Sequence, residues 1–428
     1  MRKVQILSVG ALWLAFAAIF TWRIDPDFGW HLQAGRYIWM NGVPAHDVFS
    51  YTGVNFPWID HEWLSDVLTA ELMWLGGFGL VAAWFAAVWT AALVVAARRP
   101  HWPVLAAGFA AVAADAVARP NAWSALGLAL VMLGCERGWR WRLVVVFVVW
   151  ANLHGGFAVG FLALAVAAVR RPKYWWVLAV SVAATFINPY GWNVYVEIWR
   201  TLGDSNLSGR VGEWAPLKIG VLTGFYVVLV IFAMMTRGVR RWEHVLPAGL
   251  FAAAVISMRH FILFVVGSLG VVTRGYERLV DLLRARSGWR AAVLMLVATG
   301  LVVAPVIKIM RHPGNDFPVA QVANLRERPC VGRVFNDFDF GGYMLWQLPG
   351  VSVYIDGRMP SWSDAGGSYF ERWRRVLDDE AYARSEFARY GIGCALVYPS
   401  RARLIGQLRA EGWRVSSQDG TAVLLRRP

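Results

Sequence analysis

Apolar runs separated by short basic clusters dominate the first 307 residues of this 428-residue chain. A helix needs about 20 apolar residues to cross a bilayer, and shorter helices are tolerated where protein surrounds them or where they line a cavity. The pattern therefore predicts a polytopic α-helical membrane protein with about eleven spans. The runs lie at 4–22, 79–97, 103–118, 121–135, 142–153, 157–169, 174–187, 217–236, 245–258, 260–273 and 291–307.

The composition supports a membrane protein and excludes other classes. Only 16% of the residues are charged, against about 25% in ordinary soluble domains, and 57% are hydrophobic. The formal net charge of +14 is divided among short clusters at the ends of the apolar runs. Because this charge does not form one basic face, nucleic acid is not an expected partner.

The basic clusters also predict the orientation in the membrane. If the N-terminus is cytoplasmic and the spans alternate, most Lys and Arg residues before position 308 fall on the cytoplasmic side, as the positive-inside rule requires. The first run follows Met1-Arg2-Lys3, and no small-residue cleavage site comes after it, so we interpret it as a retained signal anchor. We expect a protein integral to the inner membrane of the cell, with its C-terminal domain outside the cytoplasm.

Residues 308–428 have the character of a soluble domain, with many charges of both signs. Strands that alternate with amphipathic helices predict a small α/β domain here. The predicted division is a transmembrane domain at 1–307, with a long first outer loop at 23–76, and an extracytoplasmic domain at 308–428. Within that loop, the stretch 63–76 is apolar but contains Asp66 and Glu71, which suggests an interfacial helix. The predicted strands of the C-terminal domain are Val331–Asn336, Val351–Asp356, Cys394–Tyr398 and Thr421–Leu425, and the predicted helices are 366–379, 380–390 and 401–411.

The three cysteines carry little information. Cys135, Cys330 and Cys394 show no metal-ligand spacing. Cys330 and Cys394 could form a disulfide, because both lie in the predicted extracytoplasmic domain, but only their Cα geometry decides this.

Ionisable and amide side chains collect at the outer ends of the predicted spans. Such groups are costly near hydrocarbon and are therefore candidates for function. Arginines that only anchor helix ends would occur at both ends, without histidines, carboxylates and amides gathered on one side. The set comprises Asp25, Asp27, His31, Asp60, His61 and Glu62 in the first outer loop, Arg119, Asn121, His154, Asn188, Arg259 and His260 at later outer tips, and Asp356 and Arg358 in the C-terminal domain.

Several of these residues also have a structural interpretation. Arg119 and Arg259 could anchor helix ends by snorkelling. His154 directly precedes two glycines and could be a structural histidine with satisfied hydrogen bonds. Asp115 lies inside an apolar run, where it requires a polar partner that the sequence does not identify.

The acidic residues of the first loop could likewise cap helices. Asp25 and Asp27 precede a predicted helix over Trp30–Met40, and Asp is a favourable N-cap residue. Asp60 could cap a helix that begins near His61 in the same way.

Carboxylates beside arginines and histidines suit group transfer from a phosphate-linked substrate. A carboxylate can act as the general base toward an acceptor hydroxyl or amine. An Arg binds phosphate through two hydrogen bonds and stabilises the charge of a leaving phosphate. A site at the membrane surface favours a lipid-linked substrate such as a polyprenyl-phosphate sugar, whose tail lies in the bilayer and whose phosphate lies at the interface.

The stretch from Asp25 to Pro44, which begins Asp-Pro-Asp-Phe-Gly-Trp-His, resembles the first outer loop of integral-membrane glycosyltransferases of the GT-C fold. Protein mannosyltransferases and lipid A aminoarabinose transferases belong to this group. The layout of spans, long first loop and outer C-terminal domain is similar too. Residues 336–343 and 354–358 are similar to the C-terminal domain of oligosaccharyltransferase catalytic subunits.

The resemblance implies a lipid-phosphate-linked sugar donor and an acidic pair in the active site, at Asp25 and Asp27. The chain also differs from the group. The usual Asp-Glu is Asp-Pro-Asp here, and Asp60-His61-Glu62 stands where relatives tend to have Lys-Pro-Pro. The Trp-Trp-Asp-Tyr-Gly motif of oligosaccharyltransferases is absent. The resemblance therefore does not assign the sugar, the acceptor or a metal, and a divalent cation such as Mg²⁺ or Mn²⁺ is left open.

The leading hypothesis is an inverting glycosyltransferase that moves a sugar from a polyprenyl-phosphate donor to a glycan, lipid or protein acceptor, with membrane lipid around it. The predicted catalytic carboxylates are Asp27 with Asp25 or Glu62. Predicted substrate-binding residues are Arg119, Arg259 and His260 for the phosphate, and His31, His61 and His154 for the sugar. Asp356 and Arg358 of the outer domain would cover the cavity or select the acceptor, and Asp60, Asn121 and Asn188 complete the set.

Three other functions stay open. A transporter or flippase would explain the short, broken helices, but the sequence shows no matching repeat halves. A metal-dependent hydrolase could use the same His, Asp and Glu residues, but they lack the ligand spacing of a known metal site. An inactive scaffold of the same fold could present its outer domain to an envelope-assembly complex.

Overall fold

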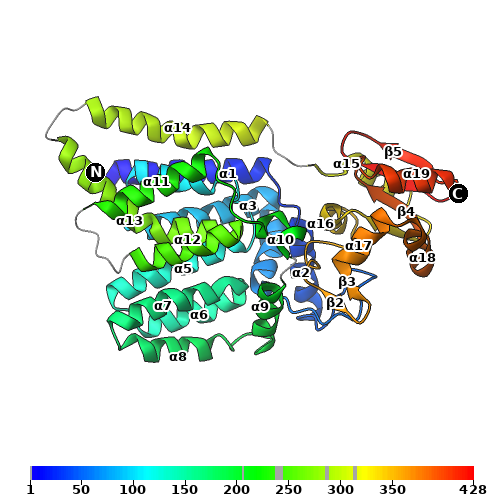
Figure 1. Cartoon of the computed structure of the whole chain (residues 1–428), viewed down its shortest axis with the longest axis horizontal. Coiled ribbons are helices and arrows are strands. Elements are labelled where there is room, and N and C mark those ends of the chain that lie inside the picture. The colour runs from blue at the N-terminus through cyan, green and yellow to red at the C-terminus, as the bar shows by residue number, and fades with distance from the viewer. Residues whose placement is uncertain (1, 205–206, 237–243, 285–288, 312–315) are drawn as a thin grey trace. The chain divides into compact units, whose positions relative to one another are not determined.

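The computed structural model describes residues 2–204, 207–236, 244–284, 289–311 and 316–428. Parts of two basic clusters, at 237–243 and 285–288, lie outside the described residues. The chain folds into two compact units, each built from segments that lie far apart in the sequence (Figure 1). The helical unit comprises Met1–Ile24, Leu72–Val194 and Val211–Gly314, and the mixed unit comprises Asp25–Glu71, Tyr195–Arg210 and Asn315–Pro428.

Each of the predicted apolar runs forms a helix. Two helices, Lys3–Trp22 and Trp63–Ala97, are long and apolar enough to cross a membrane on their own, and the others are shorter or less apolar in the described residues. The figure of about eleven spans therefore stays a prediction. The helices are α1 (Arg2–Trp22), α3 (Trp63–Ala97), α4 (Trp102–Val112), α5 (Asn121–Arg137), α6 (Trp141–Leu153), α7 (Ala158–Arg170), α8 (Tyr174–Ala184), α11 (Val221–Met235), α12 (Val245–Ile256), α13 (Phe261–Arg284) and α14 (Trp289–Arg311).

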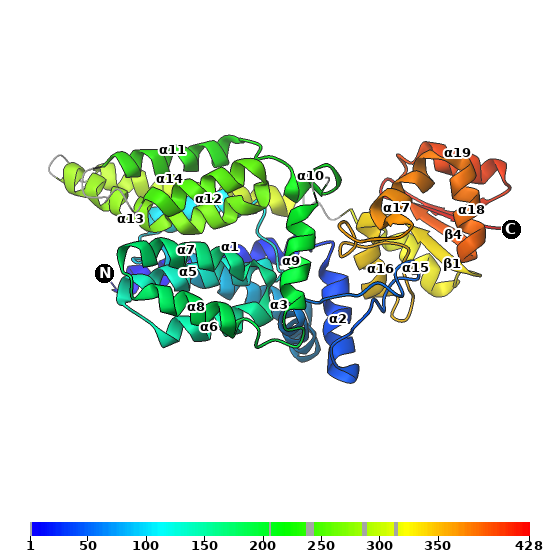
Figure 2. The ribbon, with the colours of Figure 1, turned by 60° about the horizontal axis from the view of Figure 1, so that its bottom comes forward.

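Small residues let the helices of this unit approach closely. Helices α5 to α8 pack against one another (Figure 2). A Cβ added at Gly127 of α5 would lie 2.3 Å from the ring of Trp150 on α6, and one added at Gly160 of α7 would lie 2.6 Å from the same ring. Such close packing by small residues is typical of helices in membranes.

Helix α3 is interrupted at two glycines. Gly76 and Gly77 have non-helical backbone angles, and the φ of 66° at Gly77 lies in the left-handed region that favours glycine. The break separates residues 63–75 from the apolar run that follows. This is where the sequence places the end of the predicted interfacial helix.

A four-stranded sheet forms the centre of the C-terminal part of the mixed unit, in the order β1-β4-β6-β5. β1 pairs with β4 in parallel, and the other two pairs are antiparallel. Every residue of β4 is buried. The strands are β1 (Arg333–Asn336), β4 (Ile392–Val397), β5 (Arg414–Gln418) and β6 (Val423–Arg426), with a small hairpin of β2 (Ser363–Asp364) and β3 (Gly367–Ser368). The α-helices assigned to the mixed unit as a whole are α2 (Phe28–Asn41), α9 (Asn193–Gly203), α10 (Leu207–Arg210), α15 (Val319–Glu327), α16 (Gly341–Gln347), α17 (Tyr369–Asp378), α18 (Glu380–Tyr390) and α19 (Ala402–Ala410).

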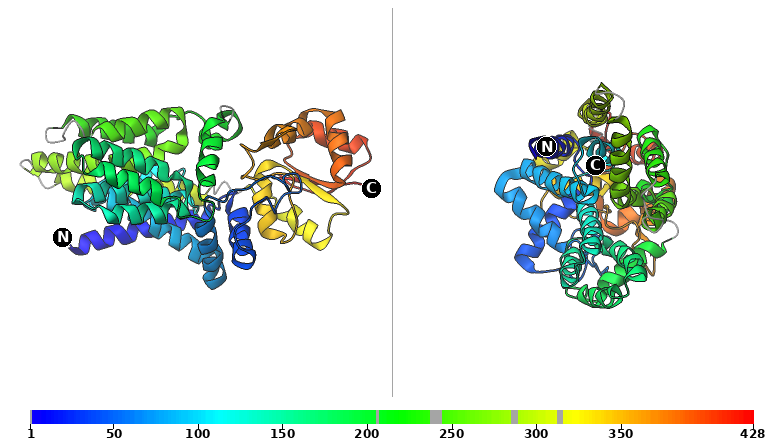
Figure 3. Two further views of the ribbon diagram at one scale, coloured as in Figure 1. Left: turned by 90° about the horizontal axis from the view of Figure 1, so that it is seen from below. Right: turned by 90° about the vertical axis from the view of Figure 1, so that its left-hand side faces the viewer.

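The first loop shares one hydrophobic core with the C-terminal residues. Trp30 and Ala34 of α2, and Tyr51 and Trp58 further along the loop, belong to the same buried cluster as the sheet. Figure 3 shows the loop, in dark blue, running beside the C-terminal elements of this unit. A division of the chain at residue 307 therefore separates segments that the structure joins. The membrane and extracytoplasmic location of the two parts stays a prediction.

One predicted strand is wrong, and one strand of the four-stranded sheet was missed; the short hairpin of β2 and β3 was not predicted either. Val351–Asp356 is extended but lies outside the sheet, because its backbone pairs with the first loop through a single bridge between Ser50 and Val353. The side chain of Asn336 binds the same segment, accepting from Tyr354 N and donating to Ile355 O. The missed strand is β5, whose sequence has one apolar residue, Val415, and therefore shows no clear alternation.

A disulfide joins Cys330 to Cys394, with Cα atoms 6.0 Å apart. The bond links the segment before β1 to β4, the strand that pairs with it. Cys135 lies in α5 and is a free cysteine.

We expect peptide mapping of the non-reduced, alkylated protein to find Cys330 and Cys394 in one linked peptide and Cys135 alkylated. The change Cys330→Ser should lower the stability of the mixed unit, since a crosslink that spans 64 residues contributes about 4 kcal/mol through loss of chain entropy in the unfolded state. Denaturant unfolding with and without reductant measures this. Full alkylation of both cysteines in the folded, non-reduced protein would contradict the disulfide.

Candidate functional site

Asp25 and Asp27 lie at the start of α2, as predicted. Asp25 is buried, and its Oδ1 accepts a hydrogen bond from the backbone N of Asp27 at 2.7 Å. Asp27 occupies the N-cap position of α2, but its side chain makes no capping hydrogen bond there. Its carboxylate instead lies against Gly357, where an added Cβ would come within 1.8 Å of Asp27 Oδ1. Helix capping therefore does not account for the Asp27 side chain.

A buried acidic cluster lies between α2 and the beginning of α3; it consists of His31, Asp60, Glu62 and Asp66. His31 Nδ1 lies 2.7 Å from Asp66 Oδ1 and 3.7 Å from Glu62 Oε2. A side-chain hydrogen bond links Asp60 to Asp66, and Asp60 Oδ1 also accepts from Glu62 N at 3.1 Å. The helices can approach because residue 35 is glycine, where a Cβ would lie 2.0 Å from Asp66 O.

Burial raises the pKa of two carboxyl groups in this cluster, those of Asp60 and Asp66. Burial, with a further contribution from the charge of Glu62, raises the pKa of Asp60 to about 7. A carboxyl group with a pKa near neutral can donate or accept a proton at physiological pH. His61 lies at the edge of this cluster, about a third exposed, with Nε2 3.8 Å from Glu62 Oε1.

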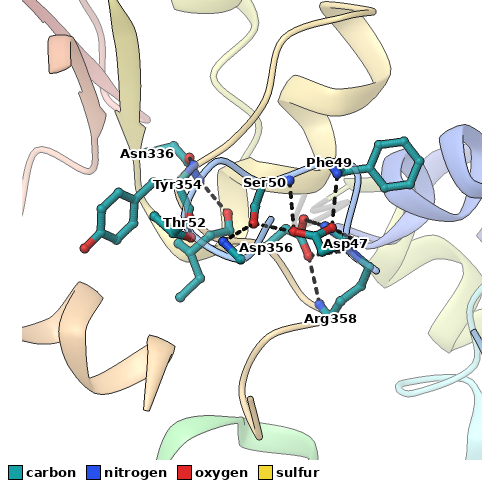
Figure 4. A network of polar contacts seen from close by, with 10 residues as sticks. Asp47, Phe49, Ser50, Thr52, Asn336, Tyr354, Asp356 and Arg358 are labelled. Atoms are coloured by element: carbon teal, nitrogen blue, oxygen red, sulfur yellow. Dashed lines mark hydrogen bonds and ion pairs between the residues drawn. The ribbon is translucent and has the colours of Figure 1, made fainter. Parts of the chain in front are cut away.

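The Arg358 cluster joins the first loop to the segment after β1; it consists of Asp47, Asp356 and Arg358 (Figure 4). The guanidinium donates to Asp356 Oδ1 at 2.9 Å, to Asp356 Oδ2 at 2.6 Å and to Asp47 Oδ1 at 2.7 Å. All three side chains are at most 2% exposed. Three aromatic rings surround the guanidinium, those of Phe49, Trp58 and Trp362. The predicted substrate-binding pair Asp356 and Arg358 is thus engaged in contacts within the protein.

A second charged group, the arginine cluster, lies in the helical unit; it consists of Arg119, Glu213, Trp214, Arg259 and His260. Arg119 donates to Glu213 Oε1 at 2.6 Å, and the guanidinium of Arg259 lies 5.0 Å from the centre of the Trp214 ring. The His260 ring packs edge-on against Trp214. The charge of Arg119, and secondarily that of Arg259, holds the pKa of Glu213 below its ordinary value.

Two further residues lie close to the arginine cluster. The charge of Arg23 acts on Asp115, which identifies Arg23 as the charged neighbour that the sequence left unassigned. Asn121 begins α5, and in the described structure its buried Oδ1 has no hydrogen-bond partner.

His154 and Asn188 hold turns between helices. His154 Nδ1 lies 2.6 Å from Ser124 Oγ and accepts from Gly156 N, so it caps the short 3-10 helix Gly155–Phe157. Asn188 accepts from Tyr190 N and donates to Thr185 O. These contacts match the structural interpretation of His154, and Asn188 holds its turn in a similar way. A role in substrate binding stays a prediction for both residues.

The sequence did not single out three of these charged residues as functional: Asp47, Asp66 and Glu213. Asp47 had one local signal, since Ser50 stands three residues later and both its N and Oγ donate to Asp47. Glu213 had none, because its partner Arg119 lies 94 residues away.

No group of three or more His, Cys, Asp or Glu residues suited to hold a metal ion occurs among the described residues. The acidic cluster comes nearest in composition, but its side chains bond to one another. Among the described residues, no side-chain group is therefore assigned to a divalent cation.

The change Arg358→Met should leave two buried carboxylates without their cation and lower the free energy of unfolding by about 3–5 kcal/mol. The matched control is Arg375→Met, because Arg375 is 62% exposed and its surface ion pair with Asp379 contributes under about 1 kcal/mol. Denaturant unfolding of both variants gives the comparison. Equal stability of the two variants would show that the Arg358 cluster is not what holds the loop.

The raised pKa of Asp60 predicts that stability falls as the pH increases. The folded state favours the protonated form of Asp60. The resulting contribution to the free energy of unfolding is complete below the unfolded pKa of about 4 and is lost as the pH rises through about 7. The change Asp60→Asn should remove the loss and stabilise the protein above pH 7, whereas Asp378→Asn, at an exposed carboxyl, should keep the wild-type profile. Thermal unfolding from pH 4.5 to 8.5 tests this, and a wild-type profile in Asp60→Asn would contradict it.

No family model matches the sequence, and no curated protein sequence matches it either. Solved structures, in contrast, match the fold over nearly the whole chain. The crystal structure of ArnT, the lipid A aminoarabinose transferase, from Cupriavidus metallidurans bound to undecaprenyl phosphate is 12% identical and has a TM-score of 0.57, with 98% of this chain and 97% of that chain covered.

The archaeal oligosaccharyltransferase AglB from Archaeoglobus fulgidus, in complex with an inhibitory peptide and a dolichol-phosphate, is 10% identical with a TM-score of 0.60. Here 93% of this chain and 69% of that chain are covered. At such identities the likeness concerns the fold, and it confirms the resemblance noted in the first outer loop. The chain has the GT-C fold, the fold of these integral-membrane glycosyltransferases.

Proposed function

We propose that the protein transfers a sugar from a polyprenyl-phosphate-linked donor to an envelope acceptor on the extracytoplasmic face of the inner membrane, with inversion at the anomeric carbon. The observation that carries the proposal is the likeness of fold over 98% of the chain to a transferase solved with undecaprenyl phosphate. A second transferase of this fold, solved with a dolichol-phosphate, supports the same class of donor.

In the proposed reaction, Asp27 is the general base. Its carboxylate takes the proton of the acceptor hydroxyl or amine, and the freed lone pair attacks the anomeric carbon. The bond between this carbon and the phosphate oxygen breaks, and the polyprenyl phosphate leaves with the electron pair. A single displacement inverts the anomeric configuration. Asp25, whose carboxylate holds the backbone N of Asp27, orients the base, and Glu62 is the alternative base.

The arginine cluster is the proposed site of the donor phosphate. Arg119 and Arg259 are the two basic side chains of this cluster, and the charges of both lower the pKa of Glu213. An Arg stabilises the negative charge that develops on a leaving phosphate. His260 packs edge-on against Trp214 in the same cluster.

Two observations support an extracytoplasmic C-terminal domain. Disulfides persist in oxidising compartments outside the cytoplasm, and this domain contains the bond between Cys330 and Cys394. The distribution of Arg and Lys along the apolar runs favours the same orientation. About eleven spans would then place the N-terminus in the cytoplasm.

The test uses the purified full-length protein in nanodiscs with a panel of undecaprenyl-phosphate-linked sugars, and it measures release of undecaprenyl phosphate. We expect Asp27→Asn to lower turnover by about 100-fold or more, because the base is lost, while undecaprenyl phosphate still binds. Arg119→Gln and Arg259→Gln should weaken undecaprenyl phosphate binding about 10- to 100-fold, since each removes a charge-assisted hydrogen bond. The control Arg171→Gln should bind as the wild type does.

Two results would count against the proposal. Wild-type turnover in Asp27→Asn would remove Asp27 as the base. A wild-type protein that neither binds undecaprenyl phosphate nor consumes any donor of the panel would favour the inactive scaffold instead.

A further inference from the structure

Backbone contacts without intervening side chains hold the segment that carries Asp25 and Asp27. A Cβ added at Gly342 of α16 would lie 2.1 Å from Pro26 O, and one added at Gly29 of α2 would lie 1.8 Å from Gly342 O. Helices α2 and α16 therefore meet through two glycines. Gln33 Nε2 donates to Leu345 O at 2.9 Å and extends the same contact. The start of α2 is thus packed directly on an element from the C-terminal part of the chain.

The turn Asp356-Gly357-Arg358 meets the Asp27 carboxylate in a different way. An added Cβ at Gly357 would lie 1.8 Å from Asp27 Oδ1, 2.7 Å from Asp27 Cγ and 3.1 Å from Asp27 Oδ2. The φ of Gly357 lies outside the left-handed region, so the backbone conformation does not require glycine here. Space for the carboxylate is what requires it.

The turn is itself immobilised. Arg358 N and Nε both donate to Asp356 Oδ1, and the guanidinium reaches Asp47. The preceding residues are fixed by the Asn336 side chain and by Thr52, whose Oγ1 donates to Tyr354 O at 2.6 Å. Gly357 therefore presents a rigid surface to the Asp27 side chain.

We propose that Gly357 is a positioning residue for the carboxylate of Asp27, so that the C-terminal domain sets the geometry of the base. The inference rests on the proposed function, which makes Asp27 the base. Gly357 touches no substrate and acts only through Asp27. A methyl group at this position displaces the carboxylate by rotation of its side chain and leaves the backbone contacts between α2 and α16 in place.

The experiment compares Gly357→Ala with Gly406→Ala, a control in α19 whose added Cβ would meet no atom within 4 Å. A displacement of about 1 Å in a reacting group can lower the rate about 100-fold. We therefore expect Gly357→Ala to lower kcat by roughly 10- to 100-fold. The KM for the undecaprenyl-phosphate-linked sugar and the binding of undecaprenyl phosphate should stay within about twofold of the wild type, because the proposed phosphate site, the arginine cluster, does not include Gly357. Gly406→Ala should keep wild-type kcat.

A double-mutant cycle with Asp27→Ala separates positioning from general damage. Once the carboxylate is absent, the methyl group has room, so Gly357→Ala should cause no further loss of turnover in the Asp27→Ala background. The thermal midpoint gives a second readout that needs no activity. Any decrease in the midpoint caused by Gly357→Ala should disappear when Asp27→Ala is present.

Three patterns would overturn the inference, and they are distinguishable. If Gly357→Ala has the wild-type kcat and Asp27→Ala is inactive, Asp27 is still the base. Gly357 then does not position its carboxylate. Additive losses of both turnover and thermal midpoint in the double variant mean that the methyl group damages the fold. Full turnover in Asp27→Ala means that the proposed base is wrong, and the positioning role falls with it.

Discussion

The guanidinium of Arg358, buried between Asp47 and Asp356, is the interaction on which the mixed unit depends. It joins two segments 311 residues apart in the sequence. One cation and two carboxylates leave a net negative charge out of water, and backbone N–H groups of Phe49 and Ser50 stabilise Asp47 further. Buried ion pairs add little net stability, but removing one partner is costly. We interpret the cluster as a device that selects one register between the loop and residues 353–356.

That register places the acidic residues of the first loop. With the loop held on the C-terminal part of the chain, Asp27 lies against Gly357 and α2 lies against α16. The acidic cluster then forms where α2 meets the beginning of α3. Carboxylates in one loop thus acquire different environments, and the pKa of Asp60 rises to about 7 through burial. Such differences between nearby carboxyls are what acid–base chemistry requires.

The arginine cluster of the helical unit contains the positively charged side chains Arg119 and Arg259. Glu213 accepts from Arg119 and has a lowered pKa, whereas Asp60 has few cationic neighbours and a raised one. The two groups illustrate that neighbouring charge and burial, which depend on the fold, decide what an acidic residue does. In the structural interpretation, Arg119 and Arg259 only anchor helix ends. In the structure, the charges of both act on the carboxylate of Glu213.

Local pattern determined much of the fold. Continuous apolar runs located the helices of the helical unit, and the motif that begins at Asp25 indicated the GT-C fold that the solved structures share. Three of the four predicted strands are present, since β1, β4 and β6 have apolar residues that the core buries. The residue types of the proposed site were also visible in the sequence, because carboxylates, histidines and arginines gathered at the ends of apolar runs are unusual.

Only the tertiary structure decided which residues meet. The partner of Arg358 in the first loop, the contact of Gly357 with Asp27 and the pairing of Glu213 with Arg119 all join positions far apart in the sequence. The extended segment 351–356 lies outside the sheet, because Val353 forms its backbone hydrogen bonds with Phe49 and Tyr51 of the first loop. Local pattern records the preference of a segment for helix or strand. It carries no information about which distant group will neutralise a buried charge, since that depends on how the whole chain packs.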